Sequence, residues 1–164
     1  MNELDENPEL TTFFALLENA FPETSVQVGF HESNEAYLNE LRGLLFTGQD
    51  WRTVDFPENE NEHVVDAFQM LDGTSKMYYI AAYMREAILD PFYQSGCLTH
   101  LRSFCNVPGG IFSRMTPYQR ESAVWFCEMV EKQINSLPMM ERLGQAMDSL
   151  AAKHIKNTVR NTLW

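Results

Sequence analysis

The chain has 164 residues, of which 45% are hydrophobic and 21% are charged. A chain of this kind can bury a core, so its composition excludes a fully disordered protein, a collagen-like protein and a disulfide scaffold. The net charge of −11 argues against a generic binder of nucleic acid or anionic membranes, because both need positive charge. We expect a single domain over residues 1–164 that does not bind nucleic acid directly.

The acidic residues are concentrated in the first half of the chain. Residues 1–75 hold 16 acidic residues and two basic ones, whereas residues 76–164 hold seven acidic and ten basic ones. The densest acidic stretch runs from Asp50 to Asp66. Such a stretch is ordinarily a solvated surface that keeps a protein soluble. The alternative is a surface that binds a basic partner or mimics nucleic acid.

The N-terminal region predicts one helix and at most one extended segment. Residues 1–7 are acidic and polar, so we expect a disordered tail that lacks the features of a secretory signal. Asn7 and Pro8 fit the N-cap and first position of a helix that Pro22 ends. Residues 24–30 are rich in β-forming residues but short, so they form at most one short extended segment.

A second helix and an acidic loop follow. The helix is predicted to begin at residue 33 or 34. Gly48 lies where a left-handed residue would end it. Residues 49–61 then form an acidic loop, in which we expect Trp51 and Phe56 to anchor against the core.

The middle of the chain predicts two more helices. One runs from about Glu60 to Leu71, with an apolar stripe at helical spacing. Thr74 or Ser75 is the expected N-cap of the next, which ends before Pro91. Its apolar residues lie on almost every side, so we expect it at the centre of the fold.

The C-terminal region completes the predicted bundle. A shorter helix carries Cys97–Cys105, and residues 106–115 form a loop rich in Gly and Pro. Thr116–Gln119 (TPYQ) is a capping box with Pro at the first helical position. Pro138 opens the last helix. The sequence therefore predicts an all-α, single-domain bundle of six or seven helices.

Three short motifs carry a resemblance. They are FTGQDW at residues 46–51, MYYIAAYM at residues 77–84 and MTPYQRESAVWF at residues 115–126. With them the chain resembles a family of small, functionally uncharacterised bacterial helical proteins, classed as a domain of unknown function. The likeness spans about Leu16 to Val130. Because that family has no established activity, the resemblance implies a helical fold and assigns no catalytic residue.

The cysteines and the apolar runs indicate where in the cell the protein is located. The three cysteines are Cys97, Cys105 and Cys127, and an odd number without a CxxC motif indicates reduced thiols. The longest apolar run, residues 77–84, is far shorter than a membrane span. We therefore expect a cytoplasmic protein that does not contact a membrane.

Two patterns were considered as metal or nucleophile sites. Cys97 and His100 lie one helical turn apart, but a zinc site needs three or four ligands and no second pair lies nearby in the sequence. The acidic stretch lacks the spacing of an EF-hand loop. We therefore expect no metal, no cofactor and no catalytic residue, and we favour a protein that is not an enzyme.

Two further groups of residues allow alternative interpretations. A pocket could be lined by Tyr79, Tyr83, His100 and Trp125, although such residues more often fill a core. Methionines in the C-terminal helices either fill a core or form an adaptable surface, including one for homodimerisation. These are Met115, Met129, Met139, Met140 and Met147.

Our leading hypothesis is a non-enzymatic interaction module, such as a bacterial immunity or inhibitor protein, that binds a basic partner through its acidic half. The expected partner-binding residues are Asp50, Trp51, Asp55, Phe56, Glu58, Glu60, Glu62 and Asp66, with either aromatic residue as an anchor if it is exposed. One alternative is a small-molecule-binding or hydrolytic helical protein with a pocket near Tyr79 and His100. Another is a DNA-mimic inhibitor of a nucleic-acid enzyme.

Overall fold

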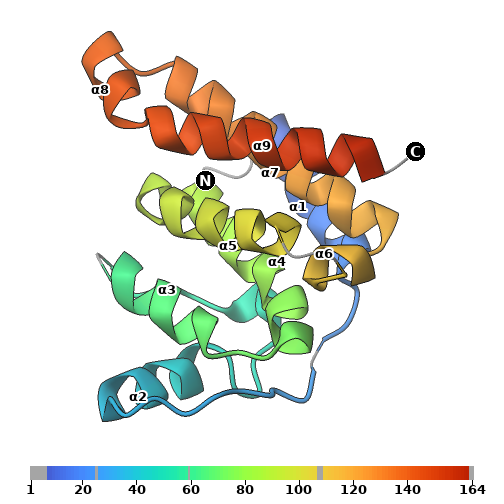
Figure 1. Cartoon of the computed structure of the whole chain (residues 1–164), viewed down its shortest axis with the longest axis vertical. Coiled ribbons are helices and arrows are strands. Elements are labelled where there is room, and N and C mark those ends of the chain that lie inside the picture. Colours follow the sequence, from blue (N-terminus) through green and yellow to red (C-terminus); the bar gives the residue numbers. More distant parts are fainter. Residues whose placement is uncertain (1–6, 25, 59, 107–108, 163–164) are drawn as a thin grey trace. The chain divides into compact units, whose positions relative to one another are not determined.

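A computed structural model describes residues 7–162, apart from residues 25, 59, 107 and 108. Within this part of the chain, nine α-helices and two short 3-10 helices form without a β-strand (Figure 1). The α-helices are α1 (Pro8–Ala20), α2 (Ala36–Leu45), α3 (Asn61–Gln69), α4 (Gly73–Leu89), α5 (Gln94–Asn106), α6 (Ile111–Arg114), α7 (Pro117–Asn135), α8 (Met139–Gly144) and α9 (Ala146–Thr162). The 3-10 helices are η2 (Trp51–Thr53) and η3 (Pro91–Tyr93). The prediction of an all-α fold is confirmed.

The chain forms two compact units. Unit 1 consists of residues 1–22 and 101–164, and unit 2 consists of residues 23–100. Helix α5 begins in unit 2 and ends in unit 1. Unit 1 thus joins the two ends of the chain, a long-range pairing that hydrophobic spacing along the sequence does not reveal.

Helix α7 is the centre of unit 1, where it packs against both α1 and α9. Figure 1 shows α7 and α9 side by side, in orange and red. Each of the three helices turns an apolar stripe inward, as amphipathic helices do. The buried residues of these stripes include Phe13, Leu17, Phe126, Val130, Ile155 and Val159.

Ion pairs join the helices of unit 1. Among the described residues, the pairs are Glu9 with Lys132, Glu128 with Arg160, and Glu131 with Lys156. The first connects α1 to α7, and the other two connect α7 to α9. The pair of Glu131 and Lys156 is the least exposed, with 15% of each side chain accessible. Carboxylates in unit 1 therefore help to hold its helices together.

The predicted N-caps of unit 1 are present. The Thr116 hydroxyl accepts from the backbone N–H of Gln119 at 3.2 Å, and the Gln119 amide oxygen accepts from the N–H of Thr116 at 3.0 Å. The side chain of Asn7 accepts from the N–H of Glu9 at 3.0 Å. These bonds satisfy helix N–H groups that otherwise have no partner.

Helix α4 is the centre of unit 2, as predicted. Residues 78–84 are all at most 4% exposed. Its N-cap, however, is Asp72 and not Thr74 or Ser75, since the Asp72 carboxylate accepts from the N–H of Ser75 at 2.8 Å. A carboxylate at this position also interacts favourably with the helix dipole. A Cβ atom at Gly29 would collide with that carboxylate, so the glycine permits the close approach of its segment.

The acidic loop of unit 2 is tied to α4. Trp51 and Phe56 are only 2% and 6% exposed, so both anchor the loop against the core as expected. The Tyr79 hydroxyl donates to the carbonyl of Gln49 at 2.8 Å. Arg85 donates to two further loop carbonyls. The helix thus supplies donors to a segment that makes few regular backbone hydrogen bonds.

Two C-terminal segments differ from the prediction. Within residues 106–115, predicted as a loop, α6 forms one helical turn and buries Phe112. Gly109 precedes it with a φ of +69°, a conformation that favours glycine. The predicted last helix is divided into α8 and α9 at Gln145. Phe112 of α6 packs into a buried position, whereas α8 buries no residue, and periodicity alone predicts neither feature.

The segment before α2 also differs in detail. Residues 24–30 form no strand in their described part, and Phe30 makes one antiparallel bridge with Leu71. Helix α2 begins at Ala36, later than predicted, and Glu35 makes no side-chain cap. Helix α2 ends at Leu45 with Phe46 as its C-cap, so Gly48, which has a φ of +71°, lies in the turn after the helix and does not end it as predicted.

Candidate functional site

Unit 2 contains a hollow of about 310 Å³ with acidic residues in its lining. The lining comes from α3 (Glu62, Val65 and Asp66) and from the first part of α5 (Ser95, Gly96 and Thr99). We call it the acidic hollow. It presents carboxylates from one helix and hydroxyls from the other, a combination of groups that can receive a cationic side chain.

The two carboxylates of the acidic hollow are available. Glu62 and Asp66 are exposed and lie four residues apart on α3, so they project from the same helix face. Within the residues that the structure describes, neither carboxylate makes a hydrogen bond or an ion pair. Like charges at this spacing destabilise a helix slightly. A cation bound between them would relieve that repulsion.

Glu60 has a different role. Its carboxylate accepts from the Tyr37 hydroxyl at 2.6 Å and lies 3.9 Å from Nδ1 of His63. The rings of Tyr37 and His63 meet edge to face, with centroids 5.0 Å apart. The hydrogen bond to Glu60 is the main cause that raises the pKa of Tyr37. Glu60 therefore connects α2 to the start of α3.

The other predicted partner-binding residues fall into two groups. Asp50 pairs with Arg52 at 3.0 Å and caps η2, while Asp55 and Glu58 are exposed. Trp51 and Phe56 were expected to anchor a partner only if exposed. Both are buried, so neither can do so. Glu62 and Asp66 are the predicted residues that the structure brings together in a hollow.

The hollow also includes residues that the sequence did not single out. Ser95, Gly96 and Thr99 contribute its second wall. Their residue types point only weakly to a binding site, because small residues are common on helix faces. Their importance depends on α5 lying opposite α3, which is a tertiary relationship.

The residues of the alternative pocket lie in a packed core. Tyr79, Tyr83 and His100 are 0%, 0% and 2% exposed in unit 2, whereas Trp125 belongs to α7 in unit 1. The rings of Tyr83 and His100 are 5.6 Å apart. Neither the Tyr83 hydroxyl nor Nε2 of His100 has a hydrogen-bond partner among the described residues.

The chemistry of these core groups is unsuited to acid–base catalysis near neutral pH. Burial lowers the pKa of His100 to about 4, with the charge of Lys76 a smaller cause. Burial raises the pKa of Tyr83 far above its usual range. At pH 7 the imidazole is neutral and the phenol is protonated, and both are shielded from solvent. A general base works best with a pKa near the working pH.

The predicted methionine surface divides between the core and the solvent. Met115 and Met129 are buried. An exposed apolar face instead extends over α8 and the start of α9. Its residues are Met139, Met140, Leu143, Met147 and Leu150, each between 58% and 78% exposed. Homodimerisation through this face stays a prediction.

The described residues are also without the arrangement of a metal site, a disulfide or a membrane-spanning helix. Among the described residues, no group of three or more His, Cys, Asp or Glu side chains is arranged to hold a metal ion. None of the three cysteines forms a disulfide. Of the helices formed by the described residues, none has both the length and the apolar character needed to cross a bilayer.

In comparisons with known proteins, the chain matches no family model, no curated protein and no solved structure.

Proposed function

We propose that this protein is a non-enzymatic interaction module, of the immunity or inhibitor type, that binds a basic protein through the acidic hollow. The observation that carries the proposal is the pair of exposed, unpaired carboxylates of Glu62 and Asp66 beside the hydroxyl groups of α5. A lysine or arginine side chain of the partner would lie between them. We also propose membership of the uncharacterised bacterial family that the three sequence motifs resemble, and a cytoplasmic location in which the thiols stay reduced.

The charge of unit 2 supports this proposal. Residues 23–100 contain 13 acidic and four basic residues, a net charge of −9. Such a field accelerates the approach of a basic protein and disfavours acidic competitors. The hollow then supplies a defined position for one cationic side chain, which a diffuse charge does not.

The experiment is affinity capture from the host lysate with the full chain and two double variants. E62K/D66K reverses both charges in the hollow. E32K/E40K changes the net charge equally at exposed residues outside the hollow. We expect a basic protein that wild type and E32K/E40K retain and E62K/D66K loses.

The association rate with the purified partner measures the same effect. We expect E62K/D66K to reduce that rate by about tenfold at low salt, because exposed charges attract an oppositely charged partner as it approaches. Equal losses in both variants would reduce the effect to net charge and contradict a role for the hollow. Retention of the partner by E62K/D66K would also contradict it.

A further inference from the structure

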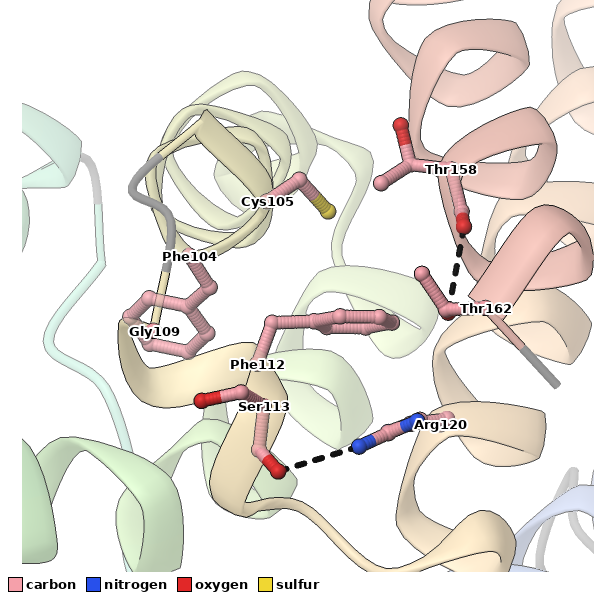
Figure 2. Close-up of a pocket in the computed structure, with 8 residues that line it drawn as sticks. All are labelled: Phe104, Cys105, Gly109, Phe112, Ser113, Arg120, Thr158 and Thr162. Carbon is pink, nitrogen blue, oxygen red and sulfur yellow. Dashed lines mark hydrogen bonds between the residues drawn. The ribbon is translucent and has the colours of Figure 1, made fainter.

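Unit 1 contains a second hollow, of about 340 Å³, shown in Figure 2. Its walls come from the end of α5, the short helix α6, the start of α7 and the end of α9. The lining residues are Phe104, Cys105, Gly109, Phe112, Ser113, Arg120, Thr158 and Thr162. We call it the arginine pocket. Its volume lies at the lower end of the range for small-molecule sites.

Aromatic and apolar atoms dominate this lining. In Figure 2 the Phe112 ring extends from α6 toward α9, and the sulfur of Cys105 points into the space between them. Phe104 forms another part of the wall. A ring or a branched aliphatic group can therefore pack in the pocket through apolar contacts.

The threonines of α9 add no free donor. The Thr158 hydroxyl donates to the carbonyl of His154 at 3.0 Å. The Thr162 hydroxyl donates within the same helix, to the carbonyl of Val159 at 2.9 Å. Each hydroxyl hydrogen is therefore engaged within the protein, and these residues offer mainly methyl groups and acceptor oxygens.

Arg120 is the charged residue of the pocket. One terminal nitrogen donates to the carbonyl of Ser113 at 3.1 Å, and the guanidinium lies 5.1 Å from the centroid of the Phe112 ring. Its Nε–H is buried and has no acceptor among the described residues. None of the described carboxylates pairs with it. The Nε nitrogen is closed to solvent, so a ligand would accept from the terminal nitrogens instead, and an anion there would balance the unpaired charge of Arg120.

We propose that the arginine pocket binds a small amphipathic carboxylate. The apolar body would lie against Phe104 and Phe112, and the carboxylate would accept from Arg120. A single guanidinium, in a mostly apolar lining whose hydroxyl hydrogens are engaged within the protein, fits a monoanion. A phosphate dianion would need further donors, which the threonines do not provide. This site is separate from the acidic hollow in residues and in charge, so it stands independently of the proposed interaction function.

The test uses two probes of nearly the same shape. 4-Phenylbutyrate carries the carboxylate, and 4-phenylbutyramide replaces it with a neutral amide. Binding to the full-length protein is measured by calorimetry or ligand-observed NMR. We expect the carboxylate to bind at least about tenfold more tightly than the amide, because a charge-assisted hydrogen bond to Arg120 is lost in the amide.

Three variants locate the binding. R120Q removes the charge from the pocket and should weaken carboxylate binding by about tenfold or more. R102Q removes an exposed arginine of α5 that does not line the pocket, and should bind like wild type. T158L keeps Arg120 but fills the pocket from α9, so it should abolish binding. It therefore tests the proposal independently if R120Q fails to fold.

Cys105 provides a direct report of occupancy. Its side chain lines the pocket and is partly exposed, while Cys97 and Cys127 are buried. Burial raises the pKa of Cys105 to about 11, so its slow reaction with methyl methanethiosulfonate is best followed at mildly alkaline pH. Bound 4-phenylbutyrate should slow modification of Cys105, and C105S should remove this signal.

Four results would contradict carboxylate binding in the arginine pocket. The proposal is overturned if wild type does not bind 4-phenylbutyrate at millimolar concentration, or if the amide binds equally well. It is also overturned if folded R120Q binds as wild type does, or if the probe binds without protecting Cys105.

Discussion

Glu131 in unit 1 and Asp66 in unit 2 are both carboxylates on helices, but their surroundings are opposite. Glu131 pairs with Lys156 between α7 and α9, and both side chains are largely shielded from solvent. Asp66 is exposed beside Glu62 and has no partner among the described residues. Three acids of unit 1 join helices, whereas Glu62 and Asp66 on α3 of unit 2 stay available for another molecule.

The two units also differ in the charge of their hollows and in their buried polar groups. The acidic hollow and the arginine pocket have similar volumes, yet one presents carboxylates and the other a guanidinium. Each unit shields a pair of opposite charges, Arg85 with Glu86 in unit 2 and Glu131 with Lys156 in unit 1, and unit 2 also buries the uncharged ring of His100. Charge and pairing, more than the volume of a hollow, distinguish polar groups that hold a unit together from those that are left without a partner among the described residues.

The largest effect should come from His100. The pKa of His100 is about 4 in the folded protein and 6.5 in the unfolded chain. Between these pH values His100 is therefore protonated in the unfolded chain and neutral in the folded protein. The free energy of unfolding should therefore fall as the pH falls through this window, by about 3 kcal/mol in total. Urea unfolding at several pH values measures it.

Two variants separate His100 from carboxylates that titrate in the same range. H100Q should flatten the pH dependence of stability between pH 6.5 and 4. H31Q changes an exposed histidine and should leave that dependence unchanged. Identical slopes for wild type and H100Q would show that His100 does not remain neutral in the core.

A smaller effect is expected at Glu131. E131Q leaves the shielded ammonium group of Lys156 without its counter-ion, so it should lower the free energy of unfolding by about 2 kcal/mol. E128Q breaks the more exposed pair with Arg160 and should cost about 0.5 kcal/mol. Equal losses in urea unfolding would mean that shielding of the pair does not matter.

The smallest effect tests the availability of the α3 acids. D66N removes the repulsion between Glu62 and Asp66, and should raise the free energy of unfolding by about 0.3 kcal/mol. D55N changes an exposed carboxylate outside any helix and serves as the control. A loss of stability in D66N alone would reveal a structural role for Asp66 and weaken the contrast with Glu131.

Local sequence patterns predicted much of the fold. The Thr116–Gln119 box and the Asn7 cap follow from hydrogen bonds between residues two or three apart. The position of α4 as a central helix follows from apolar residues on nearly every side. The cap of α4 was missed, because Asp72, Thr74 and Ser75 are all good capping residues. Gly29 lies against Asp72 in the structure, and this contact between distant residues cannot be read from the three neighbouring capping candidates.

The candidate sites were predicted only in part. Glu62 and Asp66 were identified by charge, but the opposing wall of Ser95 and Thr99 was not. Arg120 was not singled out, since a lone arginine in a helix carries no signal. The sequence left open whether the C-terminal methionines fill a core or form a surface, and in the structure Met140 and Met147 are exposed on α8 and α9.

The sequence by itself determined the helical character of the chain, its main N-caps and the acidity of its first half, because these depend on residue types and on neighbours within one or two turns. Only the tertiary structure decided which acids are paired, which apolar faces stay exposed and which helices enclose a hollow. Those properties depend on contacts such as Glu131 with Lys156 and α3 with α5, between residues far apart along the chain.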